Sequence, residues 1–266
     1  MSTLPHHKGY VDAPTGQVHY RSMGEGPPVV LLHQTAWSSI QFKNAMPFLA
    51  RAGLRAIALD TPGYGMSDGF TQPPTISDYA ANLPAVFDAL GLAKAPIVGH
   101  HTGAIIGVAF AARFPDRVSA CVLHGLPYYL PEERADRLAR PHFDQTPLPD
   151  GSHLTKRWTV AQKGSPTASL EAIQMSMLTF FLTGPTEWYG HVAVWSHDAK
   201  ADIEGIKAPT LLLTNAGDLV HQMVPRVRAL RPDFQVAEMK GGTHHVIFDE
   251  PEAWSAIVAK FIKAHG

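Results

Sequence analysis

Three short segments, far apart in the chain, carry side chains that could do acid, base or nucleophilic chemistry. The first is "GHHTG", Gly99 to Gly103, between an apolar run and a helical pattern. A G-x-X-x-G turn between a strand and a helix holds its central side chain above the sheet on a strained backbone, beside the free N–H groups of the helix N-terminus. The presented residue is His101, and Thr102 lies one residue beyond the apex.

The other two segments follow apolar runs late in the chain. Asp218 lies in "TNAGDLV" after "PTLLL", and His244 lies in "KGGTHH" after "FQVAEM". The order apex residue, carboxylate, histidine is the order in which one class of hydrolases carries its nucleophile, orienting acid and base. Taken alone, Asp218 could equally cap a helix, and His244 or His245 could be a loop histidine facing solvent.

The elements that would position these residues alternate between short apolar runs and helical patterns. Strands are expected at 18–21, 28–33, 54–60, 95–100, 118–125, 209–213 and 234–239. Helical spacing covers 36–53, 76–92, 101–118, 219–232 and 250–265. Near-continuous apolar strands joined by helices indicate an α/β fold with a mostly parallel sheet flanked by helices.

The middle of the chain has a different pattern. From residue 126 to about 208 the strand signal disappears, and aromatic and helical stretches such as "SLEAIQMSMLTFFLTG" replace it. This pattern predicts a helical cap at 126–208 inserted into a core domain made of 1–125 and 209–266. The strand and helix alternation resumes after the insertion.

Composition excludes several classes of function. The chain has 266 residues, 45% of them hydrophobic and 17% charged, with a formal net charge of −1, which suits one globular core. Lys and Arg form no run, so we expect no nucleic-acid partner and no membrane partner. The single cysteine, Cys121, and a start without a leader pattern favour a cytoplasmic location.

Five segments together resemble the α/β-hydrolase superfamily over essentially the whole chain. They are "LLHQTAWSS", "ALDTPGYGMSD", "GHHTG", "AGD" and "GGTHHVIFDEPE". The resemblance implies the α/β-hydrolase fold with Asp218 as the acid and His244 as the base. Counting back from "EPE" selects His244 over His245. It also implies that the backbone amides of Thr35 and Thr102 form an oxyanion hole.

Two positions depart from the family pattern. His101 stands where the family has Ser, Cys or Asp, and Gln34 replaces the usual glycine after His33. The missing apical aspartate excludes the alkyl-enzyme ester of haloalkane dehalogenases and epoxide hydrolases, and the missing hydroxyl excludes simple serine esterase chemistry. We interpret the chain as an atypical family member.

Several mechanisms stay open for a histidine at the apex. His101 could be the nucleophile of an acyl-imidazole route, or it could bind substrate or act as an acid while His244, oriented by Asp218, is the base. The second arrangement is the preferred one. A metal site built from His101, His244 and Asp218, a cofactor-free oxygenase or lyase, and a catalytically silent receptor also stay open.

The expected activity is hydrolysis of a small carbonyl substrate of the ester or lactone type. Most cap aromatic residues are expected to form the cap core, with one or two lining the pocket. The candidate substrate-binding residues are Gln34, His124, Trp195 and His197. We expect no cofactor and no metal, and either a monomer or a homodimer. A decarboxylase, lyase, oxygenase or receptor on the same scaffold is the alternative.

Overall fold

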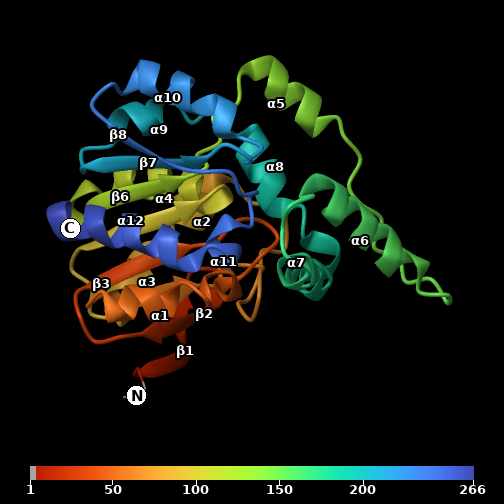
Figure 1. Cartoon of the computed structure of the whole chain (residues 1–266), viewed down its shortest axis with the longest axis horizontal. Helices are drawn as coiled ribbons and strands as arrows, with labels where there is room; N and C mark the ends of the chain where they lie inside the picture. The colour runs from red at the N-terminus through yellow and green to blue at the C-terminus, as the bar shows by residue number, and fades with distance from the viewer. Residues whose placement is uncertain (1–3) are drawn as a thin grey trace.

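The computed structural model describes residues 4–266, and a single twisted sheet runs through its larger part (Figure 1). Within these residues the sheet has eight strands in the order β1-β2-β4-β3-β5-β6-β7-β8. The strands are β1 (His6–Ala13), β2 (Gly16–Met23), β3 (Pro28–Leu32), β4 (Arg55–Leu59), β5 (Ala95–His100), β6 (Val118–His124), β7 (Thr210–Asn215) and β8 (Gln235–Met239). Pairing is antiparallel along β1, β2 and β4 and parallel from β4 to β8. The predicted mostly parallel α/β sheet is confirmed.

The central strands are buried along their whole length, whereas the edge is not. All residues of β5 and β7 are buried, as expected for parallel strands covered on both faces. In β1, by contrast, Val11 is the one buried residue. No strand was expected at β1 from the sequence, because a mostly exposed edge strand lacks the apolar run by which the others are recognised.

Helices cover both faces of the sheet and also make up residues 126–208 beside it. They are α1 (Met46–Arg51), α2 (Ile76–Ala80), α3 (Leu83–Ala89), α4 (Thr102–Arg113), α5 (Pro131–Leu138), α6 (Ser152–Gly164), α7 (Leu170–Thr183), α8 (Tyr189–Ser196), α9 (Lys200–Gly205), α10 (Val224–Leu230), α11 (Val246–Asp249) and α12 (Pro251–His265). One core layer packs α2, α3, α4 and α9 on the sheet, and the other packs α1, α11 and α12 on the opposite face.

Two predicted helices differ from the structure. The helix expected over 36–53 is reduced to α1, because the Asp60 carboxylate accepts the Ser39 N–H at 2.6 Å and holds the preceding segment in a short turn. The helix expected over 76–92 is divided into α2 and α3, with Pro84 in the first turn of α3. Proline is favoured at the start of a helix, so it marks a new start here.

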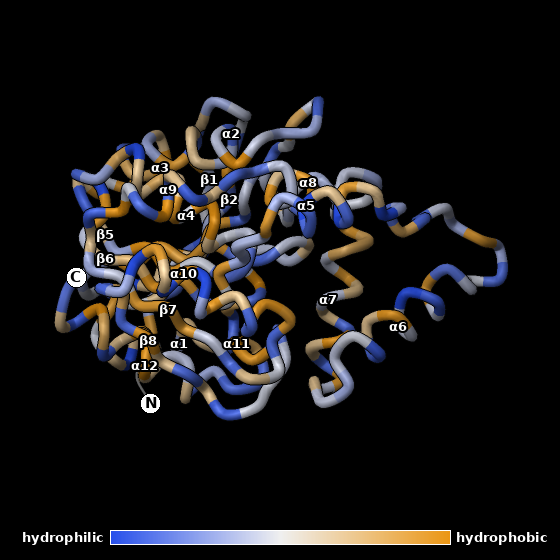
Figure 2. The backbone as a smooth tube through the Cα atoms, turned by 90° about the horizontal axis from the view of Figure 1, so that it is seen from above, coloured by the Kyte–Doolittle hydropathy of each residue, from blue (hydrophilic) through white to orange (hydrophobic). Residues whose placement is uncertain are grey.

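Residues 126–208, all of them described, contain α5 to α9 and no strand. Figures 1 and 2 show α5 to α8 beside the core, with α6 projecting away from it. Helix α8 touches the core closely, since the Gly190 N–H donates to the Tyr64 hydroxyl at 2.8 Å and that hydroxyl donates to the Glu187 carbonyl at 3.0 Å. In contrast, α9 packs against α4 of the core. The division into a core and a cap at 126–208 stays a prediction.

Across residues 4–266, no helix combines the length and the apolar composition that a membrane span requires.

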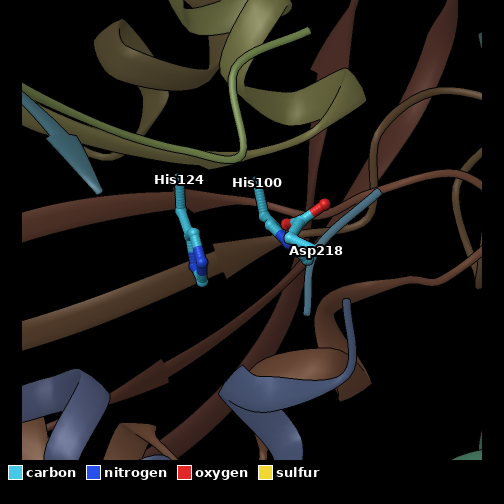
Figure 3. A group of neighbouring side chains, drawn as sticks. All are labelled: His100, His124 and Asp218. Carbon is cyan, nitrogen blue, oxygen red and sulfur yellow. The ribbon is translucent and has the colours of Figure 1, made fainter. Parts of the chain in front are cut away.

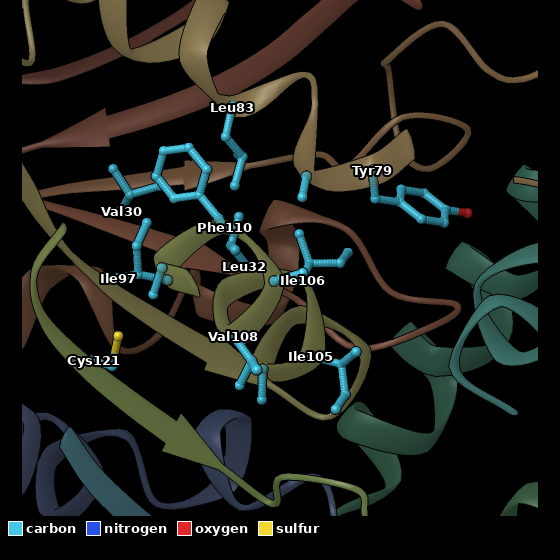
Figure 4. Packing of buried hydrophobic residues seen from close by; sticks show 14 of the residues in the cluster. Val30, Leu32, Tyr79, Leu83, Ile97, Ile105, Ile106, Val108, Phe110 and Cys121 are labelled. Carbon is cyan, nitrogen blue, oxygen red and sulfur yellow. The ribbon is translucent and has the colours of Figure 1, made fainter. Parts of the chain in front are cut away.

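Helix α4 is the buried helix that carries the GHHTG turn at its N-terminus. Ten of its twelve residues are buried. Figure 4 shows Phe110 of α4 among Val30, Leu83 and Ile97, and its ring lies 5.1 Å from that of Phe87 between centroids. The apolar packing of α4 therefore fixes where the turn stands above the sheet.

We predict that Phe110→Ala lowers the free energy of unfolding by about 3–5 kcal/mol, because the fully buried ring leaves a cavity that neighbours fill only in part. Urea unfolding followed by circular dichroism measures the change. The exposed Leu182 provides the control, and Leu182→Ala should change stability by at most about 0.5 kcal/mol. A loss below about 1 kcal/mol for Phe110→Ala would contradict this account of the core.

Candidate active site

The GHHTG turn has the strained geometry that its sequence predicts. His101 has φ 47° and ψ −112°, and it is the one non-glycine residue with positive φ in the described chain. A Cβ on Gly99 would lie 2.3 Å from the Gly103 carbonyl oxygen, and a Cβ on Gly103 would lie 2.1 Å from the Leu32 carbonyl oxygen. Only glycine fits at either position, so the two glycines permit the sharp turn that presents His101.

The His101 ring binds the Asp218 carboxylate directly. Its Nε2 lies 2.9 Å from both Asp218 carboxylate oxygens, and the Asp218 side chain is fully buried. Because an ionised carboxylate only accepts, Nε2 carries the proton and donates. In the neutral ring Nδ1 then carries the lone pair, which is the arrangement of a histidine base oriented by an acid.

Asp218 is held in its ionised form. Burial alone would raise its pKa, but the charge of His101 and the hydrogen bond from the His101 ring outweigh burial and hold the pKa well below the usual range. The Val220 N–H also donates to Asp218 Oδ1 at 3.0 Å. These contacts compensate the carboxylate for the water that burial removes.

Gly125, at the end of β6, makes the room for this pair. A Cβ at this position would lie 2.5 Å from His101 Cδ2 and 2.7 Å from Asp218 Oδ2, and Gly125 has φ +55°. Any larger residue would therefore separate the imidazole from the carboxylate. Sequence reasoning missed Gly125, although a glycine directly after a strand, next to the expected site, was the available signal.

The expected partnership of Asp218 with His244 differs from the structure. Among the described residues, the hydrogen bonds to the Asp218 carboxylate come from His101 and from the Val220 backbone, not from His244. The imidazole at the apex is longer than a serine hydroxyl and reaches the carboxylate itself. His244 instead lies beside His101, with ring centroids 6.3 Å apart, and its Nδ1 lies 3.3 Å from the Ser165 hydroxyl of the cap.

Burial lowers the pKa of His244 well below its usual value, and the charges of His245 and His101 add to the effect. Burial and the charge of His101 likewise lower the pKa of His245 to about 4. Both rings are therefore neutral at pH 7. The structure brings His244 to the site as an uncharged imidazole without a carboxylate partner.

Thr35 and Thr102 bring two loops together beside His101. Their hydroxyls lie 2.9 Å apart. Thr102 begins α4, so its N–H has no acceptor within the helix, and no acceptor for the Thr35 N–H is found in residues 4–266. Two backbone donors are thus available next to the apex. Their action as an oxyanion hole stays a prediction.

Two further histidines, His100 and His124, lie beneath His101 in the protein interior. Figure 3 shows both rings extending from neighbouring strands, with Asp218 beside His100. The His100 ring centroid lies 4.3 Å from that of His101 and 4.7 Å from that of His124. Burial lowers the pKa of His124 to about 4, and burial together with the charge of His101 lowers the pKa of His100 well below its usual value.

His100, His124 and Asp218 offer ligand atoms within 4.8 Å of one another, but the hydrogen bonds of the two rings argue against metal binding. The Trp254 Nε1–H donates to His124 Nδ1, which leaves His124 Nε2–H to donate to Asn215. The Gln41 amide donates to His100 Nδ1 at 2.6 Å. Metal ligands need a free lone pair, and here each lone pair already accepts a hydrogen bond.

A cavity of about 110 Å³ opens in front of His101, between the core and the cap, and is called the elbow cavity below. Its lining consists of Thr35, His101, Thr102, Pro127, Tyr129, Arg137, His191, Val194, Trp195, Leu219 and Val220. Trp195 was expected to bind substrate, and it lines this cavity. Burial lowers the pKa of His191 to about 4, with the charge of His101 contributing, so this wall is uncharged at His191.

A second cavity of about 220 Å³, the cap cavity, shares Thr35 with the elbow cavity as a lining residue. Its lining consists of Gln34, Thr35, Ala36, Trp37, Arg157, Val160, Ala161, Gly164, Ser176, Phe180, His244 and His245. Gln34 was expected to bind substrate. It lies in this cavity wall, and its side-chain amide donates to the His244 carbonyl at 3.1 Å.

Two other expected substrate-binding residues line neither cavity. His124 is fully buried and bound to Asn215 and Trp254, because β6 ends with this side chain directed into the core. His197 pairs with Asp202 at 3.0 Å at the end of α8. A residue that sequence reasoning missed is Arg157, since nothing in its local sequence distinguishes it from other cap cations.

A family model matches most of the chain. The family model described as alpha/beta hydrolase fold matches residues 27–251. This chain belongs to that family.

Curated relatives are named hydrolases, and they are longer than the matched segments. The bifunctional epoxide hydrolase 2 of Mus musculus is 33% identical over 130 residues, which cover 47% of this chain and 23% of that protein. The 2-hydroxy-6-oxononadienedioate/2-hydroxy-6-oxononatrienedioate hydrolase of Burkholderia vietnamiensis is 39% identical over 116 residues, covering 41% and 40%. The chain thus matches less than half the length of either relative.

A solved structure confirms the fold over nearly the entire chain. The enol-lactonase of Burkholderia xenovorans aligns with a TM-score of 0.81 and 22% identity, covering 96% of this chain and all of that one. At this identity the likeness establishes the fold alone.

We predict that Gly125→Ala separates His101 from Asp218 and abolishes their hydrogen bond, because the added methyl group would overlap both side chains. The 15N shifts of the His101 ring report the tautomer directly. Gly91→Ala is the matched control, since Gly91 also has positive φ (+67°) but no atom within 4 Å of the place that an added methyl group would take. An unchanged His101 spectrum in Gly125→Ala would refute the role of this glycine.

The buried histidines predict a loss of stability at mildly acidic pH. Burial lowers the folded-state pKa of His124 and His245 to about 4, below the value of about 6.5 in an unfolded chain. Between pH 6.5 and 4 the unfolded chain therefore binds more protons, and stability falls as the pH falls. From pH 7 to pH 5 the expected loss is about 2 kcal/mol for each of the two. Urea unfolding at both pH values measures it, and equal stabilities would contradict the prediction.

Proposed function

We propose that this chain is a hydrolase of a small carbonyl substrate of the ester or lactone type, with His101 and Asp218 as its base. The observation that carries the proposal is the hydrogen bond from His101 Nε2 to the buried Asp218 carboxylate, at the apex of the strand-to-helix turn. The names of the relatives, an enol-lactonase and a dienedioate hydrolase among them, support a small oxygen-containing substrate.

The proposed reaction uses the free ring nitrogen of His101. As a water oxygen attacks the substrate carbonyl carbon, Nδ1 of His101 takes a proton from that water. Asp218 stabilises the imidazolium that forms, as it already holds the ring through Nε2–H. The negative oxygen that develops on the carbonyl is bound by the Thr35 and Thr102 N–H groups. When the carbon–oxygen ester bond breaks, the leaving oxygen takes the proton from Nδ1, and the products are an acid and an alcohol.

The preference for His101 over His244 rests on charge. A base that becomes a cation in the reaction needs a nearby anion, and Asp218 supplies it to His101 at 2.9 Å. His244 has the Ser165 hydroxyl as its neighbour, which offers no charge. The epoxide opening of one named relative is not proposed here, because that route needs an apical carboxylate and the apex is an imidazole.

We predict that His101→Ala and Asp218→Asn each lower kcat/KM by about 100-fold or more on whichever small ester or lactone the wild type hydrolyses, because each removes part of one base. Initial rates over a panel of such substrates measure the effect. His101→Ser should not restore activity, since a hydroxyl at the apex would have no base between itself and Asp218.

His244→Ala tests the competing assignment. It should lower kcat/KM less than His101→Ala does, since the ring that hydrogen-bonds the Asp218 carboxylate is that of His101. A variant His101→Ala that keeps most activity, while His244→Ala loses it, would overturn the proposal. If hydroxylamine traps an acyl group from His101, the reaction proceeds through a covalent acyl-imidazole and not by direct attack of water. A panel in which no ester or lactone is hydrolysed would reject hydrolysis of this substrate class.

A further inference from the structure

The cap cavity contains a guanidinium group that lacks a carboxylate partner. Arg157 of α6 lines the cavity, and its Nε is buried and without a hydrogen-bond partner in the described structure. The guanidinium carbon lies 4.2 Å from the centroid of the Phe180 ring of α7. Stacking on an aromatic face holds the planar group in place and leaves its edge free to donate.

Glu187 is the acid whose charge acts on Arg157, but it does not form an ion pair with the guanidinium group. Burial raises the pKa of Glu187 to about 7, with Arg157 opposing the rise, so Glu187 is only partly ionised at neutral pH. Within residues 4–266, no salt bridge joins Glu187 to Arg157. Burial also lowers the pKa of Arg157, which shows that desolvation of its charge is not fully compensated.

A second orphaned polar group belongs to another residue in the wall of the same cavity. His245 Nδ1 is buried and has no partner among the described residues, and its ring lies 5.6 Å from the Trp37 ring between centroids. His245 and Trp37 both line the cavity together with Arg157. Unpaired buried polar groups are rare because they cost free energy, and two of the four in the described chain belong to residues that line this one cavity.

The cap cavity also lies next to the proposed reaction centre. Thr35 lines both the cap cavity and the elbow cavity, and His244 in the cap cavity wall lies beside His101. A small molecule with its reacting carbonyl at His101 could therefore extend past Thr35 into the cap cavity. Its other end would meet a planar cation, for which a carboxylate is the matching group.

We propose that the cap cavity binds a carboxylate of the substrate, held by the guanidinium of Arg157 and by His245. The inference rests on the proposed function for the placement of the reacting carbonyl at His101. The substrate class is then a small ester or lactone that carries a free carboxylate a few atoms from the carbonyl that is attacked.

Binding without turnover is the first test. Isothermal titration calorimetry compares glutarate with its uncharged counterpart glutaramide on the wild type. We expect glutarate to bind at least about tenfold more tightly, and Arg157→Gln to remove this difference, as loss of a charge-assisted pair would. Lys156→Gln is the matched control, because it removes a cation from the adjacent position of α6 that does not line the cavity.

Catalysis supplies the second test. The p-nitrophenyl monoester of glutaric acid carries a free carboxylate, and its methyl ester is the uncharged analogue. The wild type should prefer the acid through a lower KM. Arg157→Gln should lose that preference, read as the ratio of the two KM values, and Arg157→Lys should recover part of it. Lys156→Gln should keep the wild-type preference. Equal KM values for the two esters in the wild type would overturn the proposal.

The two tests separate the two proposals. Glutarate binding that depends on Arg157, together with no ester hydrolysis, would leave the carboxylate site standing and remove the proposed function. Ester hydrolysis with no preference for the free carboxylate would support the proposed function and remove the carboxylate site. Glutarate binding that survives Arg157→Gln but is lost in Arg137→Gln would place the anion in the elbow cavity and overturn the cap cavity assignment.

Discussion

The hydrogen bond between His101 and Asp218 is the interaction on which the rest of the site depends. A carboxylate without solvent contact costs several kcal/mol unless charged and hydrogen-bonding groups compensate it. Here the compensation comes from an imidazole that can be placed only by a positive-φ turn, and the turn needs glycine on both sides. Gly125 must then leave the space in which ring and carboxylate meet. The buried sheet and α4 supply the rigid frame that keeps these requirements compatible.

Burial keeps the histidines beneath and beside this pair neutral, so His101 is the histidine that pairs with the Asp218 carboxylate. His100, His124 and His244 pack close to the carboxylate, yet their lowered pKa values mean that none is charged at pH 7. If they were cations, they would compete with His101 for the single negative charge of Asp218. Burial thus leaves one carboxylate facing one directly bonded imidazole, and a base oriented by an acid requires that simple pairing.

Much of the backbone of the site was predictable from the sequence, whereas the side-chain partnerships were not. The glycine spacing around His101 and the position of Asp218 after β7 are local patterns with direct structural causes. The partner of Asp218 depends on how far an apical imidazole reaches across 117 positions of sequence, which no local pattern records. The same holds for Arg157 of α6, which lines one cavity with His245 although the two residues lie far apart in the sequence. The predicted helix at 36–53 was wrong because the Ser39 N–H donates to the Asp60 carboxylate, a contact between residues that the local pattern does not connect.

The histidine at the apex, His101, changes the structural role of His244, the histidine after the last strand. In the order apex, acid, histidine, the third residue normally bridges the first two, because a hydroxyl at the apex is too short to reach the acid. Here the apical imidazole reaches Asp218 at 2.9 Å, so no bridge is needed. His244 is thereby free to rest against Ser165 and to line the cap cavity beside Arg157. One substitution at the apex thus accounts both for the imidazole–carboxylate pair in the elbow and for a second cavity whose wall contains His244.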